Sequence, residues 1–174
     1  MKQDDYIEPV LIIDSSVIVE FINLDMLDKL AKYGEIIKAK IVLPETVRDE
    51  LSRTYSNLKF PFEVMNPPLN KMEEIGFLCP SLGEGEKGVL ALALKFKESS
   101  KTVIALLDDK RARNACKELK VNFHGTLWVL IQLKKHGIIE KNAVVNSINK
   151  LPTHGFRVRE ETLRKITAEV EKDC

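Results

Sequence analysis

The sequence predicts an α/β fold in which helices cover a mainly parallel sheet, and three short apolar runs carry that prediction. The runs are "PVLIID" at residues 9–14, "KAKIVLP" at 38–44 and "KTVIALLDD" at 101–109. Each is short and continuously apolar, as expected for a strand buried on both faces of a parallel sheet. Segments with helical spacing separate the runs, and strands that alternate with helices indicate right-handed βαβ units.

Five segments between and after these runs show the apolar spacing of helices: residues 24–34, 44–55, 83–99, 110–120 and 125–137. The first ends in a glycine suited to a C-terminal cap, and Pro44 suits the first turn of the second. The last is expected to start at Thr126 as its cap and to stop at Gly137.

Two segments depart from this alternation. Residues 56–83 contain four prolines, so we expect an irregular connection with a short helix around residues 71–76. The tail predicts a short extended piece and then a helix with a narrow apolar stripe of Leu163, Ile166 and Val170. Such a stripe can pack on the domain or face a partner, and its sequence leaves both open.

The length of 174 residues suits one domain with a single core. We expect one domain over residues 1–174, with residues 152–174 as a C-terminal extension or helix. The composition, 44% hydrophobic and 30% charged, is that of a globular protein rather than a disordered one. The start "MKQDDYIEP" does not resemble a signal peptide, and no apolar run approaches the ~18 residues of a membrane span.

The cysteines indicate the redox environment of the protein, and the charges bear on the kind of partner it binds. Cys79, Cys116 and Cys174 are odd in number and lack C-x-x-C spacing, so neither a disulfide framework nor a thiolate zinc site is indicated. A reducing cytoplasm fits this pattern. The net charge of +1 hides a basic part after residue 109, with 14 Lys and Arg against 7 Asp and Glu. This bias is compatible with a phosphate-bearing partner, although charged surface is usually just solvated.

Acidic residues follow the first and third runs. Asp14 ends the first, and Asp108 and Asp109 end the third. Ligands of an open parallel sheet bind beyond the carboxyl ends of its strands, so both sites are expected at one edge. Glu50 and Glu86 accompany apolar residues on their helices, which predicts core-facing positions where an isolated charge costs several kcal/mol.

Four carboxylates at one edge would repel one another unless a cation lay among them. Oxygen ligands of this kind suit Mg²⁺ or Mn²⁺. Each acid also has a simpler interpretation. Asp14 and Asp109 can cap the helices that follow them, Glu86 suits the dipole of a first turn, and Glu50 can pair with a nearby arginine at the surface.

Five segments resemble, in order and spacing, the successive motifs of PIN-domain proteins, most closely the VapC-like branch. They are "LIIDSSV", "LPETVRDEL", "LGEGEKGVLALA", "LLDDKRARNAC" and "VNFHGTLWVLIQLKKHGII". The resemblance runs from about Val10 to the "GFRV" segment. It implies a three-layer α/β/α PIN-like fold with a central, mainly parallel sheet of four to five strands.

The resemblance also implies a metal-dependent endoribonuclease with Mg²⁺ or Mn²⁺ as its cofactor. The catalytic acids of the family fall on Asp14, Glu50, Glu86 and Asp109, and the metal ligands on Asp14, Glu86, Asp109 and the adjacent Asp108. A cation held there would lower the pKa of a water and aim it in line at a phosphodiester phosphorus. None of the three histidines lies in a pattern that suggests a general base.

Four further residues are expected to bind substrate or support the acids: Ser15, Lys110, Arg113 and Thr126. Thr126 matches a polar position that the family often places near its acids. A cation in the first helical turn is disfavoured by ~0.3–1 kcal/mol, so Arg113 is expected to brace the carboxylates or to hold a substrate phosphate. Two positions depart from the family: Leu107 replaces a common Thr or Ser, and Gly88 a common acid.

The resemblance implies RNA, an antitoxin protein and a second copy of the chain as partners. It leaves open whether the protein is the toxin of a toxin–antitoxin pair or a nuclease of RNA maturation. The alternative is an inactive PIN-like module that binds RNA or protein, which would be expected to lack one of the acids. Two phosphate-handling classes fit poorly: a haloacid dehalogenase has a second Asp where this chain has Ser16, and a receiver has its acid pair after the first strand.

Overall fold

The computed structural model describes residues 8–99 and 101–172, and within them the strands form one parallel sheet of five in the order β3-β2-β1-β4-β5. The strands are β1 (Val10–Ile13), β2 (Lys40–Pro44), β3 (Glu63–Met65), β4 (Val103–Leu106) and β5 (Asn122–His124). Residues 1–7, 100 and 173–174 of the predicted domain lie outside the described residues. The predicted parallel sheet is confirmed.

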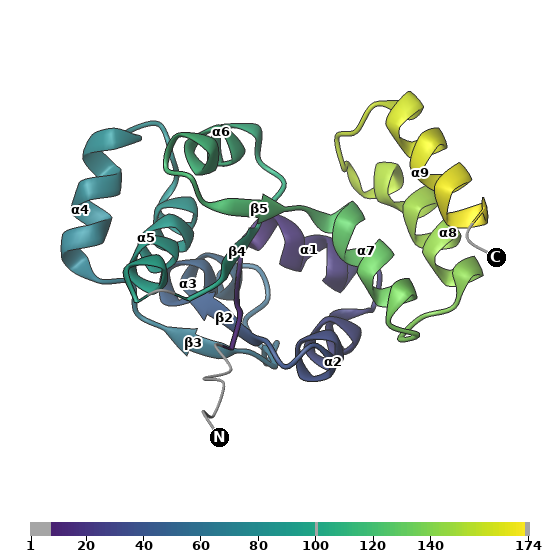
Figure 1. Ribbon diagram of the computed structural model, residues 1–174, viewed down its shortest axis with the longest axis horizontal. Helices are drawn as coiled ribbons and strands as arrows, with labels where there is room; N and C mark the ends of the chain where they lie inside the picture. The colour runs from purple at the N-terminus through teal and green to yellow at the C-terminus, as the bar shows by residue number, and fades with distance from the viewer. Residues whose placement is uncertain (1–7, 100, 173–174) are drawn as a thin grey trace, which may run out of the picture.

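Helices flank the sheet to give a three-layer α/β/α fold. They are α1 (Ser15–Asn23), α2 (Leu27–Ile36), α3 (Glu45–Ser52), α4 (Leu69–Leu78), α5 (Glu84–Glu98), α6 (Lys110–Glu118), α7 (Thr126–Lys135), α8 (Lys141–Lys150) and α9 (Glu160–Lys172), with a 3₁₀ turn at Leu151–His154. Helix α5 packs on β1, β2 and β4, while α1, α2 and α7 contact one another. In Figure 1, α4 and the pair α8–α9 lie at opposite ends of the molecule.

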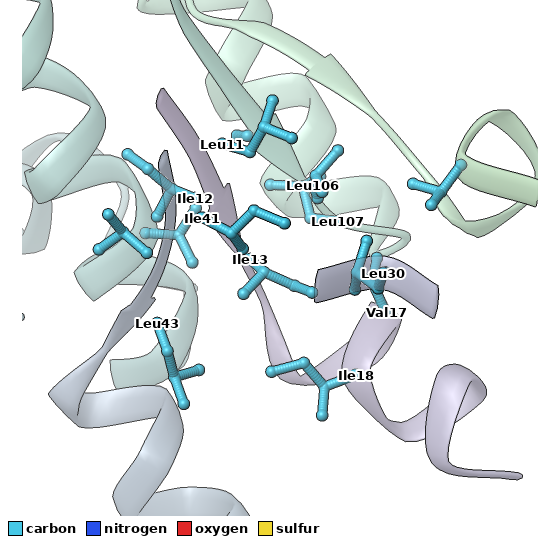
Figure 2. Packing of buried hydrophobic residues seen from close by; sticks show 14 of the residues in the cluster. Leu11, Ile12, Ile13, Val17, Ile18, Leu30, Ile41, Leu43, Leu106 and Leu107 are labelled. Carbon is cyan, nitrogen blue, oxygen red and sulfur yellow. The ribbon is translucent and has the colours of Figure 1, made fainter. Parts of the chain in front are cut away.

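The core explains why the three apolar runs form the central strands. All four residues of β1 are buried, because β1 is paired on both edges and covered on both faces. Figure 2 shows Leu11, Ile12 and Ile13 in contact with neighbouring apolar side chains of the cluster, among them Leu106 of β4. Full burial of such a side chain contributes roughly 1.5–3 kcal/mol.

Several local expectations were wrong or incomplete. Helix α2 continues past Gly34, so that glycine is not a cap; a Cβ there would lie 2.8 Å from Ile41 Cδ1, which makes it a close-packing position. Helix α7 is capped at Gly125, and Thr126 is its first residue. Gly137 does end that segment, with a φ of 67° that favours glycine.

Helix α8 and the short strands β3 and β5 were not predicted, and helix α1 was implied only by the possible role of Asp14 as a cap, not by the apolar spacing. Helix α1 contains four β-branched residues, which have low helix propensity, yet Asp14 caps it and the core buries its apolar face. The segment 56–83 contains β3 and a helix, α4, that is longer than the expected turn at 71–76.

The tail helix uses its apolar stripe within the chain. Helix α9 packs on α8, Val170 is buried, and Leu163 and Ile166 pack against the core. This settles the open choice for that stripe in favour of the domain. No helix in the described part of the chain is both long and apolar enough to cross a membrane.

Candidate active site

The acids after β1 and after β4 lie together at the point of the sheet where the order of strand addition reverses. From β1 the chain moves to β2 and β3 on one side, and β4 and β5 lie on the other. Ile13 is paired with Leu106, and the Asp14 N–H donates to the Leu106 carbonyl oxygen at 2.9 Å. The residues that follow β1 and β4 therefore lie side by side at the switch point of the sheet, where open α/β folds bind their ligands.

Asp14 combines a structural oxygen with a free one. Its Oδ2 accepts from the Ser16 N–H at 3.0 Å and the Ser16 hydroxyl at 2.6 Å, which caps α1. Its Oδ1 is buried and has no hydrogen-bond partner among the described residues. Burial raises the pKa of Asp14, the Ser16 hydrogen bonds oppose this, and the charge of Glu50 raises it further. The capping interpretation is therefore correct, but it accounts for only one of the two oxygens.

Glu86 is half-buried in the first turn of α5. Its Oε2 accepts from the Gly83 N–H at 2.8 Å, so it takes part in capping its own helix. Burial is the largest cause that raises the pKa of Glu86; the Gly83 N–H lowers it, and the charges of Asp109 and Asp14 raise it again. The three carboxylates of Glu86, Asp109 and Asp14 are thus near enough to repel one another.

Asp109 caps α6 and is the acid best suited to carry a charge. Its Oδ1 accepts from the Arg111 N–H at 2.8 Å and the Ala112 N–H at 3.0 Å. Burial raises the pKa of Asp109, but these backbone N–H groups, the charge of Arg111 and a hydrogen bond with Glu86 together outweigh that effect, and the pKa lies below its usual value. Asp109 therefore offers an anionic oxygen beside the more strongly desolvated Asp14 and Glu86.

Glu50 is exposed, so the expectation that it faces the core was wrong. The surface-pairing alternative also fails for Arg48, which pairs with other acids. Instead, the Ser15 hydroxyl donates to Glu50 Oε1 at 3.2 Å, and a Cβ on Gly85 would lie 2.6 Å from Glu50 Oε2. The absence of a side chain at Gly85 lets Glu50 of α3 lie against the first turn of α5, next to Glu86.

Asp108 is committed to contacts that tie helices together. Its Oδ2 accepts from the Thr126 hydroxyl at 2.6 Å, its Oδ1 from Arg113 Nη2 at 2.9 Å, and its N–H donates to the Ser16 hydroxyl at 3.0 Å. Burial raises the pKa of Asp108, while the hydrogen bonds from Thr126 and Arg113 lower it. A Cβ on Gly125 would lie 2.2 Å from Asp108 Oδ1, so this junction requires a glycine.

Arg113 holds the carboxylate of Asp108, which is one of the two roles predicted for it. Besides its bond to Asp108, its Nε donates to the Leu107 carbonyl oxygen at 3.1 Å. These two acceptors offset the unfavourable position of a cation in the first turns of α6. Lys110 is exposed, and Arg111 reaches the Ser81 carbonyl oxygen at 3.1 Å.

A cleft of about 1240 Å³ opens beside these residues. Its lining includes the acids Glu50, Asp108 and Asp109 together with Lys110 and Arg113. It also includes aromatic and basic residues contributed by the segment after α3, by β5, by α7 and by the segment before α9: Tyr55, Phe123, His124, Trp128, Phe156, Arg157 and Arg159. Acids that can act on a phosphate thus adjoin a surface that suits an anionic, base-bearing chain.

A family model described as a PIN domain matches residues 10–172, nearly the whole chain. The chain belongs to the PIN-domain family. No curated protein matches it. PIN domains are generally nucleases that use divalent metal ions, so membership indicates a nuclease-type function related to RNA.

The acids of this PIN domain can be tested for their fit to a divalent cation. Among the described residues, no three Asp, Glu, His or Cys side chains lie close enough together to form one ligand group. Their chemistry nevertheless fits: the donors are carboxylate oxygens, and Asp14 Oδ1 is buried without a partner. A cation beside Asp14 would relieve both that desolvation and the repulsion between Asp14, Glu86 and Asp109.

The PIN-domain site also contains residues that the sequence did not single out. Glu20 of α1 is buried and lines the cleft, and His124 and Trp128 stack on each other there. Glu20 lies three residues after the buried Val17, so a helical reading of residues 15–23 would have placed it on the core-facing stripe. The histidine gave no local signal, because its role depends on the neighbouring helix.

Proposed function

We propose that this PIN domain is an Mg²⁺- or Mn²⁺-dependent endoribonuclease that hydrolyses RNA phosphodiester bonds. The observation that carries the proposal is the buried, unpartnered oxygen of Asp14 at the switch point of the sheet, with the repelling carboxylates of Glu86 and Asp109 beside it. The cap of α1 uses only Oδ2 of Asp14. A cation site needs an oxygen that is not already hydrogen-bonded, as Oδ1 is not.

In this proposal Asp14, Glu86 and Asp109 hold the cation. The bound cation supplies an activated water and neutralises charge on the leaving oxygen. Ser16 fixes the Asp14 carboxylate through two hydrogen bonds, so that its Oδ1 keeps one orientation. The backbone N–H groups at the start of α6 hold Asp109 anionic, which makes it a ligand over a wide pH range.

Three further residues belong to the proposed site and have different roles: Glu50, Ser15 and Asp108. Glu50, oriented by the Ser15 hydroxyl, is a fourth acid at the rim and is placed to orient a water or a further cation. Asp108 is the additional candidate ligand. Because its oxygens already accept from Thr126 and Arg113, we assign it a positioning role that holds α6 and α7 in place around the acids.

The substrate class follows from the cleft. Single-stranded RNA offers a phosphate backbone to Lys110, Arg157 and Arg159 and unstacked bases to the aromatic residues. In the cell we propose a toxin of a toxin–antitoxin pair, supported by the likeness of its motifs to the VapC-like branch, with an antitoxin protein and a second copy of the chain as partners. A nuclease of RNA maturation is the alternative, and the identity of the neighbouring gene separates the two.

The decisive test is the Asp14→Asn substitution. Asn keeps the size of Asp and can still cap α1, so without metal the variant should melt no lower than the parent. With Mg²⁺ it should lose most cleavage of a mixed single-stranded RNA, and the rise in melting temperature that Mn²⁺ gives the parent should shrink.

The matched control is Asp28→Asn, because Asp28 is an exposed residue of α2, away from the acids of the site, whose carboxylate forms an ion pair with Lys29 at 3.1 Å. It should behave as the parent in both assays. A parent protein that binds RNA but cuts none with either metal would establish the inactive binding module instead. If Asp14→Asn cleaves RNA as the parent does, Asp14 serves only as the cap of α1.

A further inference from the structure

Glu20 is a buried carboxylate that the fold does not use. It lies in α1 among the buried residues Val17, Ile18 and Phe21, and only 8% of its surface is exposed. Its Oε2 is buried and has no hydrogen-bond partner in the described part of the chain. A buried carboxylate oxygen without a hydrogen-bond donor is unfavourable, so the position of Oε2 favours a ligand that brings donors from outside the protein.

The surroundings of Glu20 point to the cleft as the source of those donors. Glu20 lines the cleft together with Ser16, Asp108 and Trp128. Burial, and then the charge of Asp108, raise the pKa of Glu20 to about 7, so both effects disfavour the ionised form in the protein alone. A ligand that brings N–H donors to this carboxylate would reverse the balance.

An aromatic platform stands in the same cleft. The rings of His124 and Trp128 are stacked, with centroids 4.0 Å apart and planes 5° from parallel. Tyr33 meets Trp128 edge-on, at 6.4 Å and 81°, which fixes the indole from the core side. Planar aromatic side chains held in this way are the groups on which nucleobases stack.

We propose that the cleft binds one unpaired guanine of the RNA, stacked on the aromatic pair of His124 and Trp128, with its N1–H and N2–H groups donating to the Glu20 carboxylate. The proposal rests on the proposed function, since it names the base that the same cleft selects. It makes Glu20 a specificity-determining residue rather than a catalytic one.

Guanine is the base whose edge matches an ionised carboxylate. Its Watson–Crick edge presents two adjacent N–H donors, one for each oxygen. Adenine and cytosine present one amino donor beside a ring-nitrogen acceptor, and uracil presents one N–H between two carbonyl groups. Each of these three would place a lone pair against the buried oxygen of Glu20, at the cost of an unpaired polar group.

The experiment is a binding measurement on the full chain without metal. Trp128 is the only tryptophan of the sequence, so its fluorescence reports directly on the cleft. Four single-stranded RNA hexamers, uridine throughout except for a central G, A, C or U, are titrated in the presence of EDTA. The parent should bind the G hexamer about tenfold or more tightly than the others, as expected for a bidentate base contact.

Three variants make the result specific. Glu20→Gln should lose the guanine preference, because its amide NH₂ faces the guanine donors. Glu20→Asp keeps a carboxylate and should retain part of the preference. The control Glu73→Gln changes an exposed glutamate of α4 and should bind as the parent does. A melt of each variant shows that the comparison is made between folded proteins.

Equal binding of all four hexamers by the parent, tighter binding of another base, or an unchanged guanine preference in Glu20→Gln would each overturn the proposal. Because no metal and no cleavage are involved, this outcome is independent of the nuclease assay. A protein that selects guanine but cuts no RNA would refute the proposed activity and leave the recognition intact. A protein that cuts RNA with no base preference would do the reverse.

Discussion

Glu20→Gln should stabilise the protein at alkaline pH, and the size of the effect can be worked out. The pKa of Glu20 is raised to about 7 in the folded protein from a reference value of 4.5. A carboxyl group with a raised pKa binds its proton more tightly in the folded state, so stability falls as pH rises through that interval. At 1.36 kcal/mol for each pKa unit, the full penalty above pH 7 is at most about 3–4 kcal/mol.

The glutamine amide is also a buried polar group and keeps part of the desolvation cost, so the expected gain at pH 8 is about 1–3 kcal/mol. For a chain of this size, at about 2–4 °C for each kcal/mol, that corresponds to a rise in melting temperature of roughly 2–12 °C. Below pH 4.5 the carboxyl group is neutral in both states, and the gain should disappear.

The measurement is a series of thermal melts in EDTA from pH 4.5 to pH 8.5 for the parent, Glu20→Gln and the exposed control Glu73→Gln. The difference between parent and Glu20→Gln should grow through the interval around pH 5–7 and then level off. The reasoning fails if Glu20→Gln melts no higher than the parent at pH 8, or if it shows the same gain at pH 4.5.

The remaining predictions concern the junction around Asp108 and the assembly. Thr126→Val removes the 2.6 Å bond to the Asp108 carboxylate without changing side-chain size, and urea unfolding should show a loss of about 1–3 kcal/mol. Gly125→Ala would place a Cβ 2.1 Å from Arg113 Nη2, so it should separate Arg113 from Asp108 and lower the melting temperature, whereas the control Gly76→Ala, at a half-buried position of α4, meets no atom within 4 Å and should not. Light scattering at micromolar concentration should give about twice the chain mass, and a monomer would remove the homodimer.

The sequence predicted the parts of the fold that depend on strong, local patterns. Continuous apolar runs identified β1, β2 and β4, because these strands are buried on both faces. Strands β3 and β5 have three residues each and form the edges of the sheet, so half-exposed residues interrupt their pattern. The apolar spacing did not identify helix α1, which only the capping role of Asp14 implied, because tertiary burial overrides the low helix propensity of its β-branched residues.

The sequence predicted where the candidate site lies, but it predicted only part of the set of residues that form it. The rule that acids follow the carboxyl ends of parallel strands placed Asp14, Asp108 and Asp109 at one edge, where the structure has them. Glu50 was misplaced, because its position depends on a close approach between α3 and α5 that Gly85 permits. Glu20 belongs to no motif, and its sequence signal, a position three residues after Val17, depends on knowing that residues 15–23 form a helix.

The adjacent aspartates have different roles: Asp108 holds two helices together, and Asp109 is the proposed metal ligand. They follow β4 in extended backbone, where successive side chains point in opposite directions. Asp108 is turned toward Thr126 and Arg113, and its carboxylate is used up in joining α6 to α7. Asp109 is turned toward the start of α6, where backbone N–H groups lower its pKa and leave it anionic near Glu86. Asp108 cannot do both, because its hydrogen bonds occupy both of the oxygens that a cation would need, whereas those of Asp109 fall on Oδ1. The pair therefore gives the site a fixed frame and a free ligand side by side, and substitution of Asp108 should affect stability first, whereas substitution of Asp109 should affect metal binding first.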